Sequence, residues 1–320
     1  MATDGGRARS EVVRLALAQI DCALGDVAEN ARRVRQALAA PTARSADIVV
    51  FPELTLTGYS LGHVGEDVSR AVADAEIAGL AAETHDTALV VGFAEAGRVH
   101  TYNSAIYVEG GRVRHLHRKL YLPNYDIWEE RKHFTPGSAM RAFDTGFGRM
   151  AILLCSDAWQ PALAALAVQD GARVLIVPAN STVRRPDIEE QWRDITRFYA
   201  RTLQCYVVFV NRVGVEPGLR FWGGSHVYGP EGELVTEAPR DEPALLSADI
   251  DLAAVRRVRR EMPLVDVSRN DGCPEASNAS QTTSSGTGAP SSCPSKFARS
   301  PTERLPLQFF HTSAAVWLRQ

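Results

Sequence analysis

Cysteine is scarce in this chain and does not occur in pairs. The five cysteines in 320 residues have neither the spacing of a zinc site nor the density of a disulfide framework, and their number is odd. Scattered thiols of this kind are typical of a reducing compartment, so we expect a cytoplasmic protein. The positions are Cys22, Cys155, Cys205, Cys273 and Cys293.

Long apolar runs and a basic excess are also missing. No stretch reaches the roughly 18 apolar residues of a membrane-spanning helix, and the first ten residues lack the apolar core of a signal peptide. Lys and Arg number 35 against 38 Asp and Glu, a formal net charge of −3 that offers no basic field to nucleic acid. We therefore expect a small-molecule ligand and neither a nucleic-acid nor a membrane partner.

Apolar strand-like segments alternate with helix-like segments over most of the chain, which predicts an α/β protein whose sheets are covered by helices. A hydrophobic content of 45% over 320 residues favours one large domain over two small ones. Strands are predicted at 13–20, 47–51, 88–93, 103–108, 113–118, 174–178, 206–211 and 245–249, and helices at 26–39, 71–84, 161–170, 188–204 and 253–260.

The composition changes sharply near residue 269, where large apolar residues become rare. We predict a folded domain at 12–268, between a flexible N-terminus at 1–11 and a low-complexity, divergent tail at 269–320. The tail is either a disordered extension that ends in a docking patch or the product of a frame drift after about Ser268.

Three segments carry a chemically reactive side chain at the end of a predicted strand. Cys155 follows the apolar run Ile-Leu-Leu, Glu53 ends the run Ile-Val-Val-Phe-Pro, and Lys119 leads into a loop marked by Pro123. Strand ends gather at one edge of a sheet, so these residues make a candidate triad. Each alone also has an ordinary explanation: a buried core thiol, a turn cap and a solvated lysine.

The same segments resemble the signature blocks of the carbon-nitrogen hydrolase (nitrilase) superfamily, in the order that the family has them. The blocks lie at 52–59 (Pro-Glu-Leu-Thr-Leu-Thr-Gly-Tyr), 118–123 and 155–157, with further matches at 130–137 and 221–232. The resemblance covers roughly residues 12–268. It implies a four-layer αββα sandwich, with two mixed sheets packed face to face and helices outside.

The resemblance also implies roles for the reactive residues. Cys155 would attack the substrate, Glu53 would take the thiol proton and later activate water, and Lys119 would stabilise the tetrahedral intermediate. The backbone N–H of Ser156 would be the second donor to the oxyanion. A fourth acid would orient Lys119, and spacing favours Glu130 over its neighbour Glu129. Candidate pocket walls and polar contacts are Tyr59, Tyr125, Trp159, Asn180 and Trp222.

The implied activity is amidase-like: a cysteine-dependent hydrolysis of a small amide or N-carbamoyl compound through a thioester, with release of ammonia or an amine. It needs no metal and no organic cofactor. The residues after Cys155 are Ser-Asp, whereas nitrilases tend to have Trp-Glu, which disfavours a nitrile substrate. Segments 56–59 and 121–125 look similar to the glutaminase domains of NAD synthetases, but no synthetase-type ATP loop is found, so a stand-alone amidase is expected.

Several alternatives stay open. The chain could be a non-catalytic scaffold or binding protein that retains the fold, or a nitrilase or acyltransferase of the same superfamily. A homo-oligomer, dimeric or higher, is also open, because the tail does not resemble the family segment that packs across a subunit interface.

Lysine next to the sulfur is expected to favour the thiolate of Cys155. Asp157 is expected to tie the turn after this cysteine. His115 and His117 alternate on one predicted strand and have no third metal ligand at a convincing spacing, so we expect both on a solvated strand face.

Overall fold

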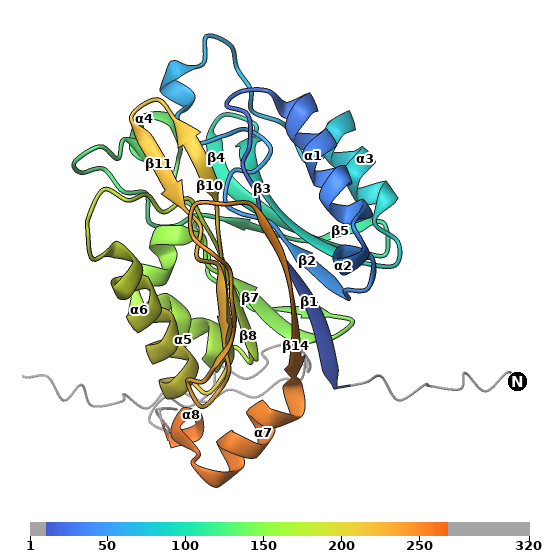
Figure 1. Cartoon of the computed structure of the whole chain (residues 1–320), viewed down its shortest axis with the longest axis vertical. Helices are drawn as coiled ribbons and strands as arrows, with labels where there is room; N and C mark the ends of the chain where they lie inside the picture. Colours follow the sequence, from blue (N-terminus) through green and yellow to red (C-terminus); the bar gives the residue numbers. More distant parts are fainter. Residues whose placement is uncertain (1–10, 268–320) are drawn as a thin grey trace, which may run out of the picture. The chain divides into compact units, whose positions relative to one another are not determined.

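Two six-stranded sheets lie face to face with helices on their outer faces in the computed structural model, which describes residues 11–267 (Figure 1). The predicted four-layer αββα sandwich of two mixed sheets is confirmed. Apart from residue 11, the predicted N-terminal arm and the tail lie outside the described residues. No helix within residues 11–267 has the length and hydropathy required to cross a bilayer.

The first sheet has the strand order β14-β1-β2-β3-β4-β5, with parallel pairing of β1 with β2 and of β2 with β3 and antiparallel pairing elsewhere. Its strands are β1 (Val12–Gln19), β2 (Ile48–Val50), β3 (Ala88–Ala96), β4 (Thr101–Glu109), β5 (Arg112–Arg118) and β14 (Ala244–Asp251).

The second sheet has the order β13-β12-β9-β8-β7-β6, with β7, β8 and β9 parallel at its centre. Its strands are β6 (Phe143–Thr145), β7 (Gly148–Ile152), β8 (Val174–Ala179), β9 (Tyr206–Asn211), β12 (His226–Tyr228) and β13 (Leu234–Glu237). A separate hairpin consists of β10 (Val213–Glu216) and β11 (Leu219–Trp222).

Helices α1 (Val27–Ala39) and α3 (Ala75–Glu83) cover the first sheet, and α5 (Pro161–Gln169) and α6 (Ile188–Thr202) cover the second (Figure 1). The predicted helix at 71–84 begins only at Ala75, because the Asp74 carboxylate accepts the Ala71 N–H at 2.8 Å and closes a turn there. The remaining helices are α2 (Pro41–Arg44), α4 (Glu130–His133), α7 (Leu252–Glu261) and α8 (Leu264–Val267), with 3-10 turns η1 (Leu61–His63) and η2 (Cys155–Trp159).

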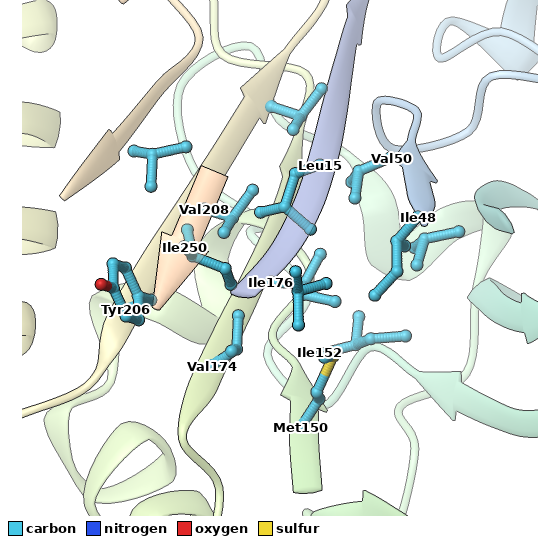
Figure 2. Packing of buried hydrophobic residues seen from close by; sticks show 14 of the residues in the cluster. Leu15, Ile48, Val50, Met150, Ile152, Val174, Ile176, Tyr206, Val208 and Ile250 are labelled. Carbon is cyan, nitrogen blue, oxygen red and sulfur yellow. The ribbon is translucent and has the colours of Figure 1, made fainter. Parts of the chain in front are cut away.

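The main core lies between the two sheets. Leu15 and Ile48 of the first sheet meet Ile152, Ile176 and Val208 of the second in one buried cluster (Figure 2). Alternate residues of β1 point the other way, into a second cluster with the helices α1 and α3. The central strands of each sheet are therefore buried on both faces, which explains their nearly continuous apolar sequences.

The ends of four strands supply the residues of interest. Glu53 follows β2, Lys119 follows β5, Cys155 follows β7, and Asn180 directly follows β8. The first two belong to the first sheet and the last two to the second, so the face-to-face packing brings polar residues from both sheets to one end of the core.

Close packing of two strands positions Glu53. A Cβ atom on Gly92 of β3 would lie 2.5 Å from the backbone N of Leu54 and 3.1 Å from the Cα of Glu53. Only a residue without a side chain allows this approach. The absence of a side chain at Gly92 therefore allows the segment around Glu53 to pack this closely against β3.

We predict that Gly92→Ala lowers the free energy of unfolding by about 1–3 kcal/mol, because the added methyl group must displace backbone. Gly79→Ala in α3 is the matched control. Its Cβ would meet only the end of the Arg35 side chain at 3.4 Å, and alanine favours a helix by up to about 1 kcal/mol. Urea unfolding of both variants measures the difference, and equal stability of the two would contradict the close approach.

Candidate active site

A fully buried lysine lies between two buried carboxylates. Lys119 Nζ is 2.7 Å from Glu53 Oε1 and 2.7 Å from Glu130 Oε1, and the exposed fractions of the three residues are 0%, 0% and 3% for Lys119, Glu53 and Glu130. Burying such charges is costly unless they are paired and hydrogen-bonded. The pairing here meets that condition, and the structure thus brings Glu53 to a lysine 66 residues away in the sequence.

Two further hydrogen bonds hold the Glu53 carboxylate. Asn103 on β4 donates its side-chain N–H to Oε1 at 2.8 Å, and the backbone N–H of Asn180 donates to Oε2 at 2.9 Å. One oxygen is thus held from the first sheet and the other from the second. Neither contact could be predicted from the sequence. A buried asparagine such as Asn103 is common, and the contact of Asn180 is made by its backbone, which every residue has.

Glu130 is held on a different side. The hydroxyl of Tyr59 donates to Glu130 Oε1 at 2.8 Å. Glu129, its rival in the sequence, is exposed and pairs with Lys132 three residues away. The structure therefore brings Glu130, and not Glu129, to the lysine.

The cysteine sits at the start of a tight turn. Cys155 opens the 3-10 turn η2 with a φ of 45°, and Leu54, next to Glu53, has a φ of 48°. Left-handed conformations of this kind cost energy in residues with a Cβ atom and often occur at functional sites. Cys22 and Cys205, in contrast, are buried packing residues whose pKa values burial raises to about 12.

Asp157 ties the cysteine turn to the lysine segment. Its Oδ1 accepts the backbone N–H groups of Leu120 and Tyr121 at 3.0 and 2.9 Å, and its Oδ2 accepts that of Leu154 at 3.2 Å. A fourth contact joins Oδ2 to His117 Nε2 at 2.9 Å. One carboxylate thus fixes the segment after Lys119 relative to the turn that carries the thiol.

The expectation that His115 and His117 lie on a solvated strand face is wrong. His117 is 2% exposed and contacts Asp157, and the ring of His115 stacks on Phe143 at a centroid distance of 4.1 Å. Both residues face the second sheet: His115 packs on its strand β6, and His117 contacts the turn η2 that follows its strand β7. The sequence pattern could not reveal this, because the covering strands come from a distant part of the chain.

The cysteine is not poised as a thiolate in the resting site. Burial, and next the Glu53 carboxylate, raise the pKa of the Cys155 thiol well above its usual value, although Lys119 acts in the opposite direction. The lysine thus favours the thiolate, as expected, but burial and the carboxylates outweigh it. Two carboxylates accompany one ammonium here, so a third negative charge on sulfur is unfavourable.

The pKa values of Lys119 and Glu130 are both raised, but for different reasons. Burial lowers the pKa of Lys119, but the carboxylates of Glu130 and Glu53 outweigh it and raise that pKa well above its usual value. Burial, opposed by Lys119, raises the pKa of Glu130 to about 7. Lys119 therefore stays charged, while Glu130 changes its protonation near neutral pH.

A cavity of about 150 Å³ opens beside the cysteine. Of the residues that the sequence predicts as pocket walls or contacts, five line it: Tyr59, Tyr125, Trp159, Asn180 and Ser156. Trp222 does not line it. Its ring is fully buried next to Phe209, and its indole N–H donates to Ser181 Oγ at 3.1 Å. Other lining residues include Trp128, Thr182, Arg184, Arg185 and Trp192.

A buried ion pair behind the cavity supports Tyr59. The carboxylate of Glu216, at the end of β10, accepts the backbone N–H groups of Tyr59 and Ser60 at 3.0 and 2.7 Å. The guanidinium of Arg212 pairs with Glu216 and lies over the Phe221 ring at 4.4 Å. Neither residue could be recognised as a candidate from the sequence, because nothing in the local pattern distinguishes them from an ordinary surface pair.

The chain resembles known proteins over most of its described length. The model of the family described as "Carbon-nitrogen hydrolase" matches residues 14–260. The glutamine-dependent NAD(+) synthetase of Rhodobacter capsulatus is 31% identical over 75% of this chain and 44% of the synthetase. This chain therefore spans less than half the length of that relative. The N-carbamoylputrescine amidase of Arabidopsis thaliana is 28% identical over 81% of this chain and 92% of the amidase.

A solved structure extends the likeness to three dimensions. A variant of the amidase from Nesterenkonia sp. AN1 is 25% identical, with a TM-score of 0.68 over 80% of this chain and 98% of the amidase. In that structure the acetamide moiety of fluoroacetamide is covalently added at the active site cysteine.

We predict that Glu53→Gln lowers the pKa of Cys155, because the substitution removes the negative charge that opposes formation of the thiolate. The midpoint of the pH dependence of Cys155 alkylation should fall by about 1 unit or more. Mass spectrometry of the alkylated peptide measures it, with the exposed Glu129→Gln as the matched control. An unchanged midpoint in Glu53→Gln would argue against this electrostatic account.

We further predict that Glu216→Ala lowers the free energy of unfolding by about 3–5 kcal/mol, since it leaves the buried Arg212 without its main partner. Glu83→Ala, which breaks the exposed Arg35–Glu83 pair, should change it by less than about 1 kcal/mol. Adding Arg212→Met to Glu216→Ala should restore part of the loss. A small effect of Glu216→Ala alone would show that the buried pair is not needed.

Proposed function

The chain belongs to the carbon-nitrogen hydrolase family, and from this premise we propose that it cleaves a small amide or N-carbamoyl compound through a cysteine thioester. The family assignment confirms the resemblance seen in the sequence, and it supports a hydrolase of carbon–nitrogen bonds. The proposal itself rests above all on one observation: Lys119 is held at 2.7 Å by both Glu53 and Glu130, at a cavity that Cys155 lines.

The first half of the reaction forms the acyl-enzyme. Because the resting thiol is neutral, Glu53 takes the proton from Cys155 Sγ as sulfur attacks the carbonyl carbon and the S–C bond forms. The negative charge moves to the carbonyl oxygen. The intermediate collapses when the C–N bond breaks, and the leaving nitrogen takes the proton from Glu53 and departs as ammonia or an amine.

The second half returns the enzyme to its starting state. Water gives a proton to Glu53 while its oxygen attacks the thioester carbon. The C–S bond then breaks, the sulfur recovers the proton from Glu53, and the acid leaves. For an N-carbamoyl substrate this acid is a carbamic acid. Each proton that Glu53 accepts is passed on within the same half-reaction.

Lys119 is well placed to stabilise the oxyanion. An ammonium has three N–H donors; two go to Glu53 and Glu130, and the third can donate to the carbonyl oxygen. The backbone N–H of Ser156 would be the second donor. Loss of one such donor typically lowers the rate by about 100-fold to 1000-fold.

The relatives support the choice of reaction. One acts on N-carbamoylputrescine by its name, and one is an amidase that takes a covalent adduct at its active site cysteine. The cavity of about 150 Å³ supports a small substrate. A retained fold without activity is the alternative, and the assay below distinguishes the two.

The test is an ammonia-release assay over short amides, N-carbamoyl amines and nitriles. We predict turnover of amides or N-carbamoyl compounds by the wild type, and a loss of nearly all turnover in Cys155→Ala and Cys155→Ser, because a serine hydroxyl has a far higher pKa than a thiol. Circular dichroism checks that the variants fold. Cys205→Ala, at a buried cysteine away from the cavity, is the matched control.

Turnover that survives in Cys155→Ala would remove the proposed nucleophile. A wild type that releases no ammonia from any substrate of the panel, and whose Cys155 does not react with thiol reagents at any pH, would support the scaffold instead.

A further inference from the structure

Polar atoms without a hydrogen-bond partner gather at the cavity. Within residues 11–267, nine buried side-chain nitrogen and oxygen atoms have no partner, and four of them belong to residues that line this one cavity. They are Glu130 Oε2, both Nδ2 and Oδ1 of Asn180, and Thr182 Oγ1. Buried polar groups in folded proteins are nearly always paired, so a local concentration of exceptions calls for a ligand that pairs them.

Asn180 is the outstanding case, because its whole side-chain amide is unpartnered although the residue is 0% exposed. Its backbone is held firmly: the N–H donates to Glu53 Oε2 at 2.9 Å, and the next residue, Ser181, receives the indole N–H groups of Trp192 and Trp222. The side chain therefore has a fixed origin beside the reacting groups. Thr182, 3% exposed, lines the same cavity, and its hydroxyl is also without a partner.

The groups that would act on the scissile amide are already assigned. Lys119 and Ser156 take the carbonyl oxygen, and Glu53 handles the protons of sulfur and leaving nitrogen. The amide of Asn180 and the hydroxyl of Thr182 are left for the part of the substrate beyond these atoms. Each can both donate and accept a hydrogen bond.

We propose that Asn180, with Thr182, selects substrates that carry an N–H next to the reacting carbonyl, namely N-carbamoyl compounds, over amides that carry a methylene there. This inference rests on the proposed function and narrows it. A methylene at this position would leave these buried atoms unpaired. Sites that hydrogen-bond a polar group of the substrate strongly reject analogues without that group. An N–H can donate to Asn180 Oδ1.

The charges at the cavity indicate a neutral substituent. Arg184 forms a two-pronged ion pair with Asp126 at 2.9 and 2.8 Å, and Arg185 lies 3.4 Å from Asp187. Both cationic lining residues thus already have a carboxylate partner. A charged substituent would have to compete with these pairs, whereas a neutral alkyl group fits the aromatic walls.

An isosteric series tests the inference: propylurea, propyl carbamate and pentanamide place N–H, O and CH2 in turn next to the carbonyl. The quantity measured is kcat/KM for ammonia release with each compound. In Asn180→Leu, which keeps the size but not the hydrogen bonds, kcat/KM for propylurea should fall about 10-fold or more further than for pentanamide. Thr182→Val should lower the ratio of kcat/KM for propylurea to kcat/KM for pentanamide in the same way, but by a smaller factor.

Asn103→Leu is the matched control. Asn103 is also buried and also bonds Glu53, but it does not line the cavity. It should lower kcat/KM for all three compounds by a similar factor and leave their ratio unchanged. Asn180→Ala repeats the test should the leucine variant not fold.

The inference is overturned if the ratio of propylurea to pentanamide stays within about 2-fold of wild type in both Asn180 variants and in Thr182→Val, or if the wild type cleaves pentanamide but not propylurea. In either of those cases the proposed function survives, because ammonia release still depends on Cys155. Failure of all three compounds and of the wider panel would instead remove the proposed function and this inference together.

Discussion

The ammonium of Lys119, enclosed between two carboxylates with no access to solvent, is the interaction on which the site depends. A charge in this position is tolerable only when its partners are held in place. The surroundings do this for each carboxylate separately. Glu53 is held by an amide side chain and a backbone N–H, and Glu130 by the hydroxyl of Tyr59. Burial, and next the carboxylate of Glu53, raise the pKa of the Cys155 thiol, so in the proposed reaction a proton transfer accompanies attack by its sulfur.

The two sheets make this arrangement possible. The apolar core between them holds the strand ends in place but does not itself supply the polar groups of the site. The chemistry lies where the strands end, with Glu53 and Lys119 from one sheet and Cys155 from the other. Asp157 joins the two sides, since its carboxylate accepts backbone N–H groups from the segment after Lys119 as well as from the turn of the cysteine.

Much of this could be predicted from the sequence, because the central strands are buried on both faces and read as continuous apolar runs. The ordered blocks around Glu53, Lys119 and Cys155 indicated which strand ends matter. Short elements such as β10 and β11, of four residues each, carry no sustained pattern. Contacts that depend on distant strands were also out of reach: the covered face of His117, the burial of Trp222 and the pair of Arg212 with Glu216 arise from packing, not from neighbours in the chain.

Residue 180, directly after β8, contacts Glu53 through its backbone. The bond from residue 180 to Glu53 is made by backbone N–H, so every amino acid except proline could supply it, while the same residue lines the cavity beside Cys155. Descendants of this protein could therefore exchange that side chain, and so change which molecules the cavity accepts, without removing the contact that holds Glu53. Residue 180 is thus a position at which specificity can diversify with little disturbance of the buried carboxylate.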